Sequence, residues 1–171
     1  IIGLGGGSSI DAAKAIALLA TNPGAIEDYE GKGKYKSVPL PVLAIPTTCG
    51  TGSEVTWVSV ITNTARKFKM SIKGPRMFPA VALADPDLLA TLPRPFVAAT
   101  GLDALTHAVE SLCTNASTPL TDAIALRAIQ MIFRSLAPAA FTDNMAAKSE
   151  QLLASAMANI SCGNTKLGLV H

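Results

Sequence analysis

The chain has 171 residues, of which 49% are hydrophobic and 15% are charged, and its formal net charge is +2. This length and apolar content predict a globular protein with a substantial buried core, and the apolar stretches are shorter than the ~20 residues that span a bilayer. A net charge this small excludes the basic footprint of a nucleic-acid-binding protein, so we expect neither a nucleic-acid nor a membrane partner.

The first residues have the pattern of a strand, a tight turn and a helix. An apolar run, Ile1 to Leu4, leads into three glycines, and a segment rich in Ala, Ile and Leu follows as far as Ala20. Ser8 and Asp11 have the spacing of a capping box, in which a hydroxyl and a carboxylate bond to backbone amides of the first helical turn. We therefore expect Ser8 to cap this helix.

Strand patterns continue as far as residue 84. Residues 31–36, in which Gly and Lys alternate, predict an exposed loop. The further predicted strands are 41–46, 55–62, 69–73 and 80–84, with the second and third of these joined in a β-hairpin around residues 63–65. This part of the chain therefore predicts an α/β domain.

The pattern changes beyond Pro93. Apolar residues recur with helical periodicity over residues 96–113, 119–136 and 146–161, and no strand pattern occurs among them. We therefore expect a domain boundary near Pro93, with an α/β domain over residues 1–92 and an all-helical domain over residues 93–171.

The glycine-rich turn is a candidate phosphate-binding site. A strand that runs into glycines and a helix N-terminus gathers backbone N–H groups and the positive end of the helix dipole, with no Cβ to block a pyrophosphate. Gly3, Gly5 and Ser8 take the places of the dinucleotide GxGxxG pattern, although the third position is Ser. On the motif alone, a pyrophosphate site and a purely structural turn both remain open.

A second polar loop follows the strand at residues 41–46. Small hydroxyl residues and glycines from Thr47 to Glu54 lie where open α/β sheets bind ligands, at the carboxyl end of a strand. The alternative is an ordinary polar turn, since Thr and Ser are common in loops. Lys69, in the predicted hairpin, either reaches a cofactor hydroxyl or belongs to a solvated strand face.

Asp103 and His107 are candidate metal ligands. They are four residues apart near the start of a predicted helix, so both side chains project from one helical face. A carboxylate and an imidazole suit Fe(II), Zn, Mn or Ni, and the alternative is a helix-stabilising Asp and His pair. The chain has two histidines, and the second, His171, is the third candidate ligand.

The three cysteines, Cys49, Cys113 and Cys162, are odd in number, far apart and without a CxxC spacing. This usage indicates neither a disulfide framework nor a cysteine-based zinc site. It fits a reduced compartment, and we expect a cytoplasmic protein.

Four segments, in their order and spacing, resemble the iron-containing (group III) alcohol dehydrogenase family. They are Gly5-Gly-Gly-Ser8 with Asp11 and Lys14, Pro46-Thr-Thr-Cys-Gly-Thr-Gly-Ser-Glu54, Gly101-Leu-Asp-Ala-Leu-Thr-His107-Ala-Val-Glu110 and Gly168-Leu-Val-His171. The resemblance covers essentially all 171 residues. It implies part of a dehydroquinate-synthase-like α/β nucleotide-binding domain followed by part of an all-helical metal-binding domain.

The resemblance also implies an activity and its residues. The enzyme would transfer a hydride between an alcohol, or an aldehyde or ketone, and NAD or NADP beside a divalent metal, with Fe(II) preferred to Zn, Mn or Ni. The implied cofactor-binding residues are Gly6, Gly7, Ser8, Asp11, Thr47, Thr48, Thr51 and Lys69. The implied metal ligands are Asp103, His107 and His171.

By the same resemblance, we expect the chain to be an internal fragment of a longer, homo-oligomeric parent that acts on a small alcohol or aldehyde. The family's early strands, which sort NAD from NADP, and a fourth ligand, a His beyond the GLVH segment, have no counterpart in these residues. Two alternatives stay open: a dehydroquinate-synthase-like lyase and a non-catalytic nucleotide-binding fragment. The Asp103 and His107 pair in GLDALTH favours the dehydrogenase.

Overall fold

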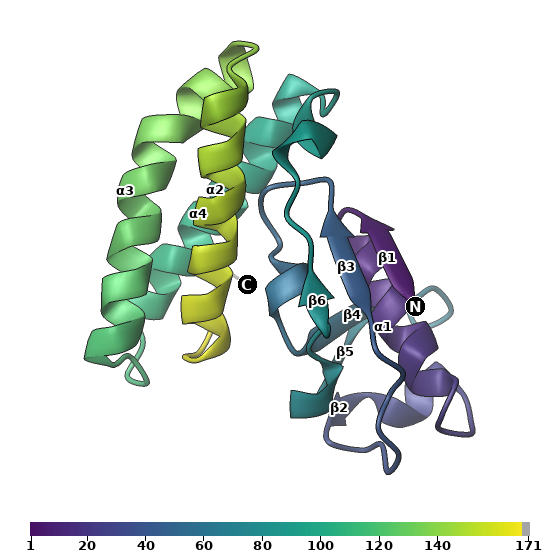
Figure 1. Ribbon diagram of the computed structural model, residues 1–171. Coiled ribbons are helices and arrows are strands. Elements are labelled where there is room, and N and C mark those ends of the chain that lie inside the picture. The colour runs from purple at the N-terminus through teal and green to yellow at the C-terminus, as the bar shows by residue number, and fades with distance from the viewer. Residues whose placement is uncertain (169–171) are drawn as a thin grey trace. The chain divides into compact units, whose positions relative to one another are not determined.

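The computed structural model describes residues 1–168, which form two compact units (Figure 1). Unit 1 consists of Ile1–Pro46 and Ser53–Leu83, and it contains both sheets and the first helix. Unit 2 consists of Thr47–Gly52 and the chain from Ala84 onward, and it contains three long helices. The predicted sequence of an α/β part followed by a helical part is confirmed, and the domain boundary between residues 92 and 93 remains a prediction.

Unit 1 has two three-stranded sheets. In the first, β1 (Ile2–Gly5), β3 (Leu43–Pro46) and β6 (Val81–Ala82) are parallel, with β3 in the middle. In the second, β5 (Phe68–Lys73) lies between β2 (Gly31–Lys32) and β4 (Val58–Asn63). The hairpin of β4 and β5 is confirmed, with Val60 opposite Ser71.

The expectation of an exposed loop over residues 31–36 is wrong at its start. Gly31 and Lys32 form β2, which pairs in parallel with Ile72 and Lys73 of β5. A two-residue strand buries no side-chain face of its own, so alternation of apolar and polar residues cannot reveal it.

The predicted capping box is also wrong. Helix α1 spans Gly7–Leu19, and its N-cap is Gly6, which has extended backbone geometry and no side-chain cap. The three glycines let the chain enter the helix one residue before Ser8, so the Ser8 hydroxyl is not in the capping position. The carboxylate of Asp11 faces the protein interior instead, where it bonds to other elements.

Helix α1 packs against β1 of the first sheet and β4 of the second. Its apolar residues join two small clusters, in which the buried members are Leu18, Tyr29, Ile72 and Met77 in one and Ala13, Ala17 and Val42 in the other. The short 3-10 helices of the chain are η1 (Ile26–Tyr29), η2 (Ser53–Val55), η3 (Pro75–Met77) and η4 (Pro86–Leu89). In unit 1 the apolar side chains thus collect where α1 covers the strands.

A buried lysine on α1 joins the helix to η2 and β4. Lys14 is 1% exposed, and its Nζ donates to Ser53 Oγ at 2.9 Å. It also donates to the carbonyl oxygens of Thr56 and Val58, both at 2.9 Å. Burial lowers the pKa of Lys14 to about 8, while the charges of Asp11 and Glu54 oppose this shift. An ammonium ion taken out of water is tolerated here because four oxygens, including Thr56 Oγ1 at 3.4 Å, lie within hydrogen-bonding distance of it.

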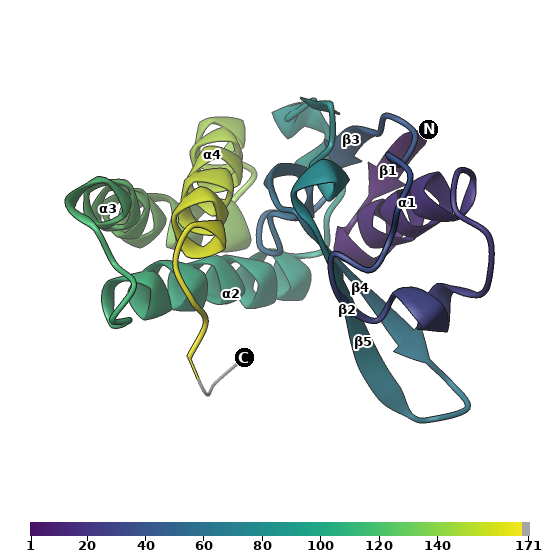
Figure 2. The same cartoon turned by 90° about the horizontal axis from the view of Figure 1, so that it is seen from below.

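Unit 2 is a bundle of three helices, α2 (Arg94–Leu112), α3 (Pro119–Phe141) and α4 (Met145–Gly163), each of which packs against the other two (Figure 2). The three predicted helices are confirmed. Alanines dominate the buried contacts, and their small side chains let the helices approach closely: Ala104, Ala108, Ala125, Ala128, Ala154 and Ala158.

Helix α3 continues through Pro138, five residues beyond the predicted end at Leu136. Its last turn buries Ala139 and Ala140 in the second core cluster of unit 2, which compensates for the amide that proline lacks. Among the described residues, α3 is also the one helix long and apolar enough to cross a membrane. One face of α3 packs against α2 and α4 as a core helix does, while other apolar side chains of α3, such as Phe133, are exposed.

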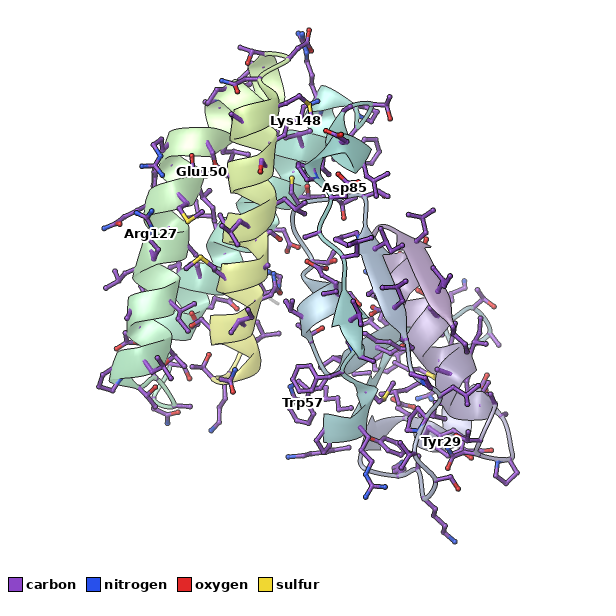
Figure 3. All side chains as sticks on the ribbon, in the orientation of Figure 1. Tyr29, Trp57, Asp85, Arg127, Lys148 and Glu150 are labelled. Carbon is purple, nitrogen blue, oxygen red and sulfur yellow. The ribbon has the colours of Figure 1, made fainter. Side chains whose placement is uncertain are left out.

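A second buried lysine lies in unit 2, where it joins α4 to η4. Lys148 on α4 donates through Nζ to the carbonyl oxygens of Leu89 and Ala90, at the end of η4, both at 3.0 Å (Figure 3). The Leu89 carbonyl oxygen also accepts a hydrogen bond from the Leu92 amide at 3.2 Å, so backbone and lysine together hold this turn. The lysine therefore fixes the segment that leads into α2.

Replacing Lys14 with Met should lower the free energy of unfolding of the full-length protein by about 2–3 kcal/mol near neutral pH, because buried oxygen acceptors lose their donor. Urea unfolding measures the change. The matched control is Lys34→Met, at an exposed lysine. Equal stability of the two variants would show that the buried ammonium holds nothing together.

The same lysine should give a pH dependence of defined sign. Its pKa is about 8 in the folded protein and about 10.5 in the unfolded chain. Between these values the unfolded chain binds a proton that the folded chain has released, so the free energy of unfolding, relative to that of Lys14→Met, should rise as pH increases from 8 to 10.5. A difference that falls over this interval contradicts the lowered pKa.

Candidate functional site

The glycine-rich turn between β1 and α1 presents an open helix N-terminus. Gly6 is the N-cap, no side chain caps the helix, and Gly6 and Gly7 are partly exposed. Ser8, in the first turn, is exposed. The first amides of a helix have no acceptor within the helix, so they are available to an anion such as a phosphate. This geometry fits the predicted pyrophosphate site.

Asp11 lies behind this turn and is 9% exposed. Its Oδ1 accepts a hydrogen bond from Ser53 Oγ at 2.5 Å, and its Oδ2 accepts one from the Val60 amide at 3.0 Å. Lys14 Nζ is 3.8 Å from Oδ1. Burial raises the pKa of Asp11, and the bond from Ser53 and the charge of Lys14 oppose that shift. Both carboxylate oxygens are thus engaged within unit 1.

The predicted threonine loop, Thr47–Gly52, packs within unit 2. Thr47 and Thr48 are half-buried and Thr51 is exposed. Cys49, between them, is 1% exposed, and its Sγ is 3.5 Å from Thr100 Oγ1 on α2. The loop follows β3 directly, and Pro46 of β3 pairs with Gly5 of β1. In the parallel sheet, both candidate loops therefore leave from the same edge.

Lys69 is exposed on β5 and lies at a shallow hollow of about 430 Å³ in unit 1. The hollow is lined by residues of β2 and β5 and by Glu30: Glu30, Gly31, Lys32, Phe68, Lys69, Ser71 and Lys73. Lys69, Ser71 and Lys73 alternate along β5, so they share one face of the strand. The solvated strand face and the cofactor contact are both compatible with this position.

The structure brings two predicted metal ligands together. His107 Nδ1 lies 3.9 Å from Asp103 Oδ2 on the same face of α2, and their side chains are 12% and 38% exposed. Two atoms this close can both reach one metal ion at the usual ligand distances of about 2.0–2.2 Å. Their oxygen and nitrogen donors fit a divalent transition metal. The third predicted ligand, His171, lies outside the described residues.

The surroundings of this pair are acidic. Glu110, one turn beyond His107, accepts a hydrogen bond at Oε2 from the Gly168 amide at 2.9 Å. Burial, together with the charges of Glu110 and Asp103, raises the pKa of the Cys162 thiol to about 11. In the part of the chain that the structure describes, no three His, Cys, Asp or Glu side chains form a metal-binding group. The described residues therefore supply a ligand pair.

Sequence reasoning missed one residue beside these sites, Asn159 on α4. It is 2% exposed, and its Nδ2 donates to the Gly50 carbonyl oxygen at 2.9 Å. The sequence offered little signal for it, because the buried residues of α4 include other polar side chains, Gln151 and Ser155 among them. Its hydrogen-bond partner, Gly50, is 109 residues away in the sequence and could not be inferred from the local pattern.

The chain thus has an α/β unit with a glycine-rich turn, followed by a helical unit with an Asp and His pair. Two family models match in the same order: "Iron-containing alcohol dehydrogenase" over residues 1–86, and "Fe-containing alcohol dehydrogenase family, C-terminal" over residues 97–171. The chain belongs to the iron-containing alcohol dehydrogenase family.

Curated relatives and solved structures agree with this placement. The chain is 47% identical to alcohol dehydrogenase 4 of Saccharomyces cerevisiae and 44% identical to the NAD-dependent methanol dehydrogenase of Bacillus methanolicus, over all of this chain and 45% of each relative. A crystal structure of sulfoacetaldehyde reductase from Bifidobacterium kashiwanohense in complex with NAD+ matches 94% of the chain and 43% of its own, with a TM-score of 0.88 and 38% identity. The chain thus spans less than half the length of these relatives.

Cysteine reactivity tests the packing of the threonine loop. Cys113 is exposed, whereas Cys49 is buried and burial raises its pKa. Near neutral pH, iodoacetamide should therefore alkylate Cys113 at least about 100-fold faster than Cys49, as measured by peptide mass spectrometry. Equal rates would mean that the loop does not pack as described.

Proposed function

We propose that the full-length protein is a metal-dependent alcohol dehydrogenase that uses NAD or NADP. The observation that carries the proposal is the pair of Asp103 Oδ2 and His107 Nδ1, 3.9 Å apart on α2, in a member of the iron-containing family. An isolated helix-stabilising pair is the alternative reading of those two residues. A dehydrogenase also needs a site for its dinucleotide cofactor, and we assign that site to the glycine-rich turn of the same chain.

For the cofactor, we assign the pyrophosphate to the turn at Gly6, Gly7 and Ser8, whose backbone amides and helix dipole favour an anion. Asp11 supports that turn from behind, because both of its carboxylate oxygens are bonded to Ser53 and Val60.

The remaining cofactor contacts are assigned to hydroxyl groups and a lysine. Thr47, Thr48 and Thr51 lie in the loop after β3, and the side chains of the first two are only partly covered. Lys69 is exposed on β5, where its ammonium group can donate to a ribose oxygen or phosphate. Hydroxyl and ammonium groups of this kind orient a cofactor and leave the redox chemistry to it.

For the metal, we assign Asp103, His107 and His171 as ligands and Fe(II) as the preferred ion, with Zn, Mn and Ni as alternatives. A bound divalent ion would polarise the alcohol oxygen and lower the pKa of its hydroxyl. The alcohol carbon would lose a hydride to the nicotinamide ring and its hydroxyl would release a proton to solvent, yielding an aldehyde or ketone and the reduced cofactor.

We also propose a substrate class and a cellular compartment. A small alcohol or aldehyde is the substrate class, since the relatives include a methanol dehydrogenase and a sulfoacetaldehyde reductase. Three cysteines that are all free fit a reduced cytoplasm. The dehydroquinate-synthase-like lyase is less well supported, because the relatives compared are dehydrogenases and a reductase.

The metal assignment is tested with the full-length protein, reconstituted anaerobically with Fe(II). Asp103→Ala and His107→Ala should each weaken iron binding about 100-fold or more and abolish nicotinamide reduction by short alcohols, because each removes one ligand. Asp143→Ala, at an exposed carboxylate outside the helices, is the control and should behave as wild type. Full iron content and turnover in both variants would leave the Asp and His pair as a helix-stabilising contact.

A further inference from the structure

The threonine loop is held against α2 and α4 more closely than a solvent-exposed turn requires. A Cβ atom on Gly50 would clash with the backbone and side chain of Thr100, and one on Gly52 would clash with the side chain of Asn159. Gly52 also has a φ of 56°, a left-handed conformation that favours glycine. The loop therefore lies in direct backbone contact with both helices.

Asn159 supplies the polar part of this contact. It is 2% exposed, and its Nδ2 donates to Gly50 O on the loop at 2.9 Å and to Ser155 O on its own helix at 3.0 Å. Both hydrogens of the amide group are thus used. Asparagine is a poor helix former, so helix propensity does not explain a buried asparagine in α4, whereas its two hydrogen bonds do.

The loop is fixed to the helix that carries the proposed metal ligands. Thr100, which contacts Gly50 and Cys49, is three residues before Asp103 on α2. Thr47 and Thr48 belong to the same segment, Thr47–Gly52, and keep partly exposed side chains. Within unit 2, the threonine hydroxyls and the Asp and His pair are therefore held by one set of packed helices.

We propose that Asn159 is a positioning residue for the nicotinamide cofactor: its bond to Gly50 O holds the loop in the conformation in which Thr47 and Thr48 bind. This inference rests on the proposed function, in which those threonines contact the cofactor. A loop that is ordered before binding does not lose conformational entropy on binding, so the bond acts by raising affinity. Asn159 itself does not touch the cofactor or the reacting atoms.

The test uses the full-length, metal-loaded protein and the isosteric change Asn159→Asp. Aspartate keeps the volume but places a carboxylate beside the carbonyl oxygens of Gly50 and Ser155, so the loop loses its donor. The Kd for NAD(P)H, from fluorescence titration, should rise about tenfold, the value of one hydrogen bond. Iron content and the KM for alcohol at saturating cofactor should not change.

The matched control is Asn164→Asp. Asn164 caps the same helix, and its Nδ2 donates to Ile160 O four residues earlier at 2.8 Å, within the helix itself. It should bind cofactor as wild type does. Should Asn159→Asp fail to fold, Gly50→Ala separates the loop from Thr100 and is expected to weaken cofactor binding in the same way.

A double-mutant cycle separates positioning from a general structural role. The threonine variant Thr47→Val with Thr48→Val should weaken cofactor binding, and adding Asn159→Asp should weaken it little further, because the asparagine acts through those threonines. The proposal is overturned if the effects of the threonine and asparagine changes on the Kd multiply independently. It is also overturned if Asn159→Asp or Gly50→Ala binds the cofactor with wild-type affinity. Wild-type affinity in the threonine variant overturns the proposed cofactor role of the loop and this inference with it.

Discussion

A buried ammonium ion is the constraint on which the first unit depends. Lys14 is 1% exposed, so the chain must surround its ammonium group with oxygens, and those oxygens come from η2, from Thr56 just after it and from β4. The Ser53 hydroxyl, which accepts a hydrogen bond from Lys14, donates its own hydrogen to Asp11 Oδ1. The position of α1, and with it the open glycine turn at its N-terminus, is therefore set by polar contacts as much as by the small apolar clusters around Leu18 and Val42. This network therefore fixes the turn to which we assign the pyrophosphate.

In the second unit, small residues determine how the elements pack. Alanines let α2, α3 and α4 approach one another, and glycines let the threonine loop lie directly on two of those helices. Asn159 and Thr100 then provide polar contacts where the loop backbone meets the helices. Asp103 and His107 lie on α2, three and seven residues after Thr100, which contacts the loop. Close packing and the chemistry of the site thus depend on the same helix surfaces.

The sequence predicted the elements well where their signals were local. Apolar runs identified β1 and β3, turn residues identified the hairpin of β4 and β5, and helical periodicity identified α2 to α4. Errors arose where a local signal was misleading or absent: the capping box at Ser8 lost to a glycine N-cap, and β2 was too short to have a pattern. The pairing of Asp103 with His107 follows from helical spacing alone, whereas the bond from Asn159 to Gly50 joins positions 109 residues apart and requires the folded chain. The roles of the cofactor residues and of the ligands stay predictions.

Direct hydride transfer is the central claim, and isotope labelling tests it most directly. The full-length, Fe(II)-loaded protein would be incubated with oxidised nicotinamide cofactor and a primary alcohol deuterated at its hydroxyl-bearing carbon, and the reduced cofactor would be examined by mass spectrometry. The account predicts that the deuterium appears on the nicotinamide ring, because the hydride moves from carbon to cofactor without exchange with water. Cofactor that stays oxidised, or that is reduced without acquiring the label, would contradict it.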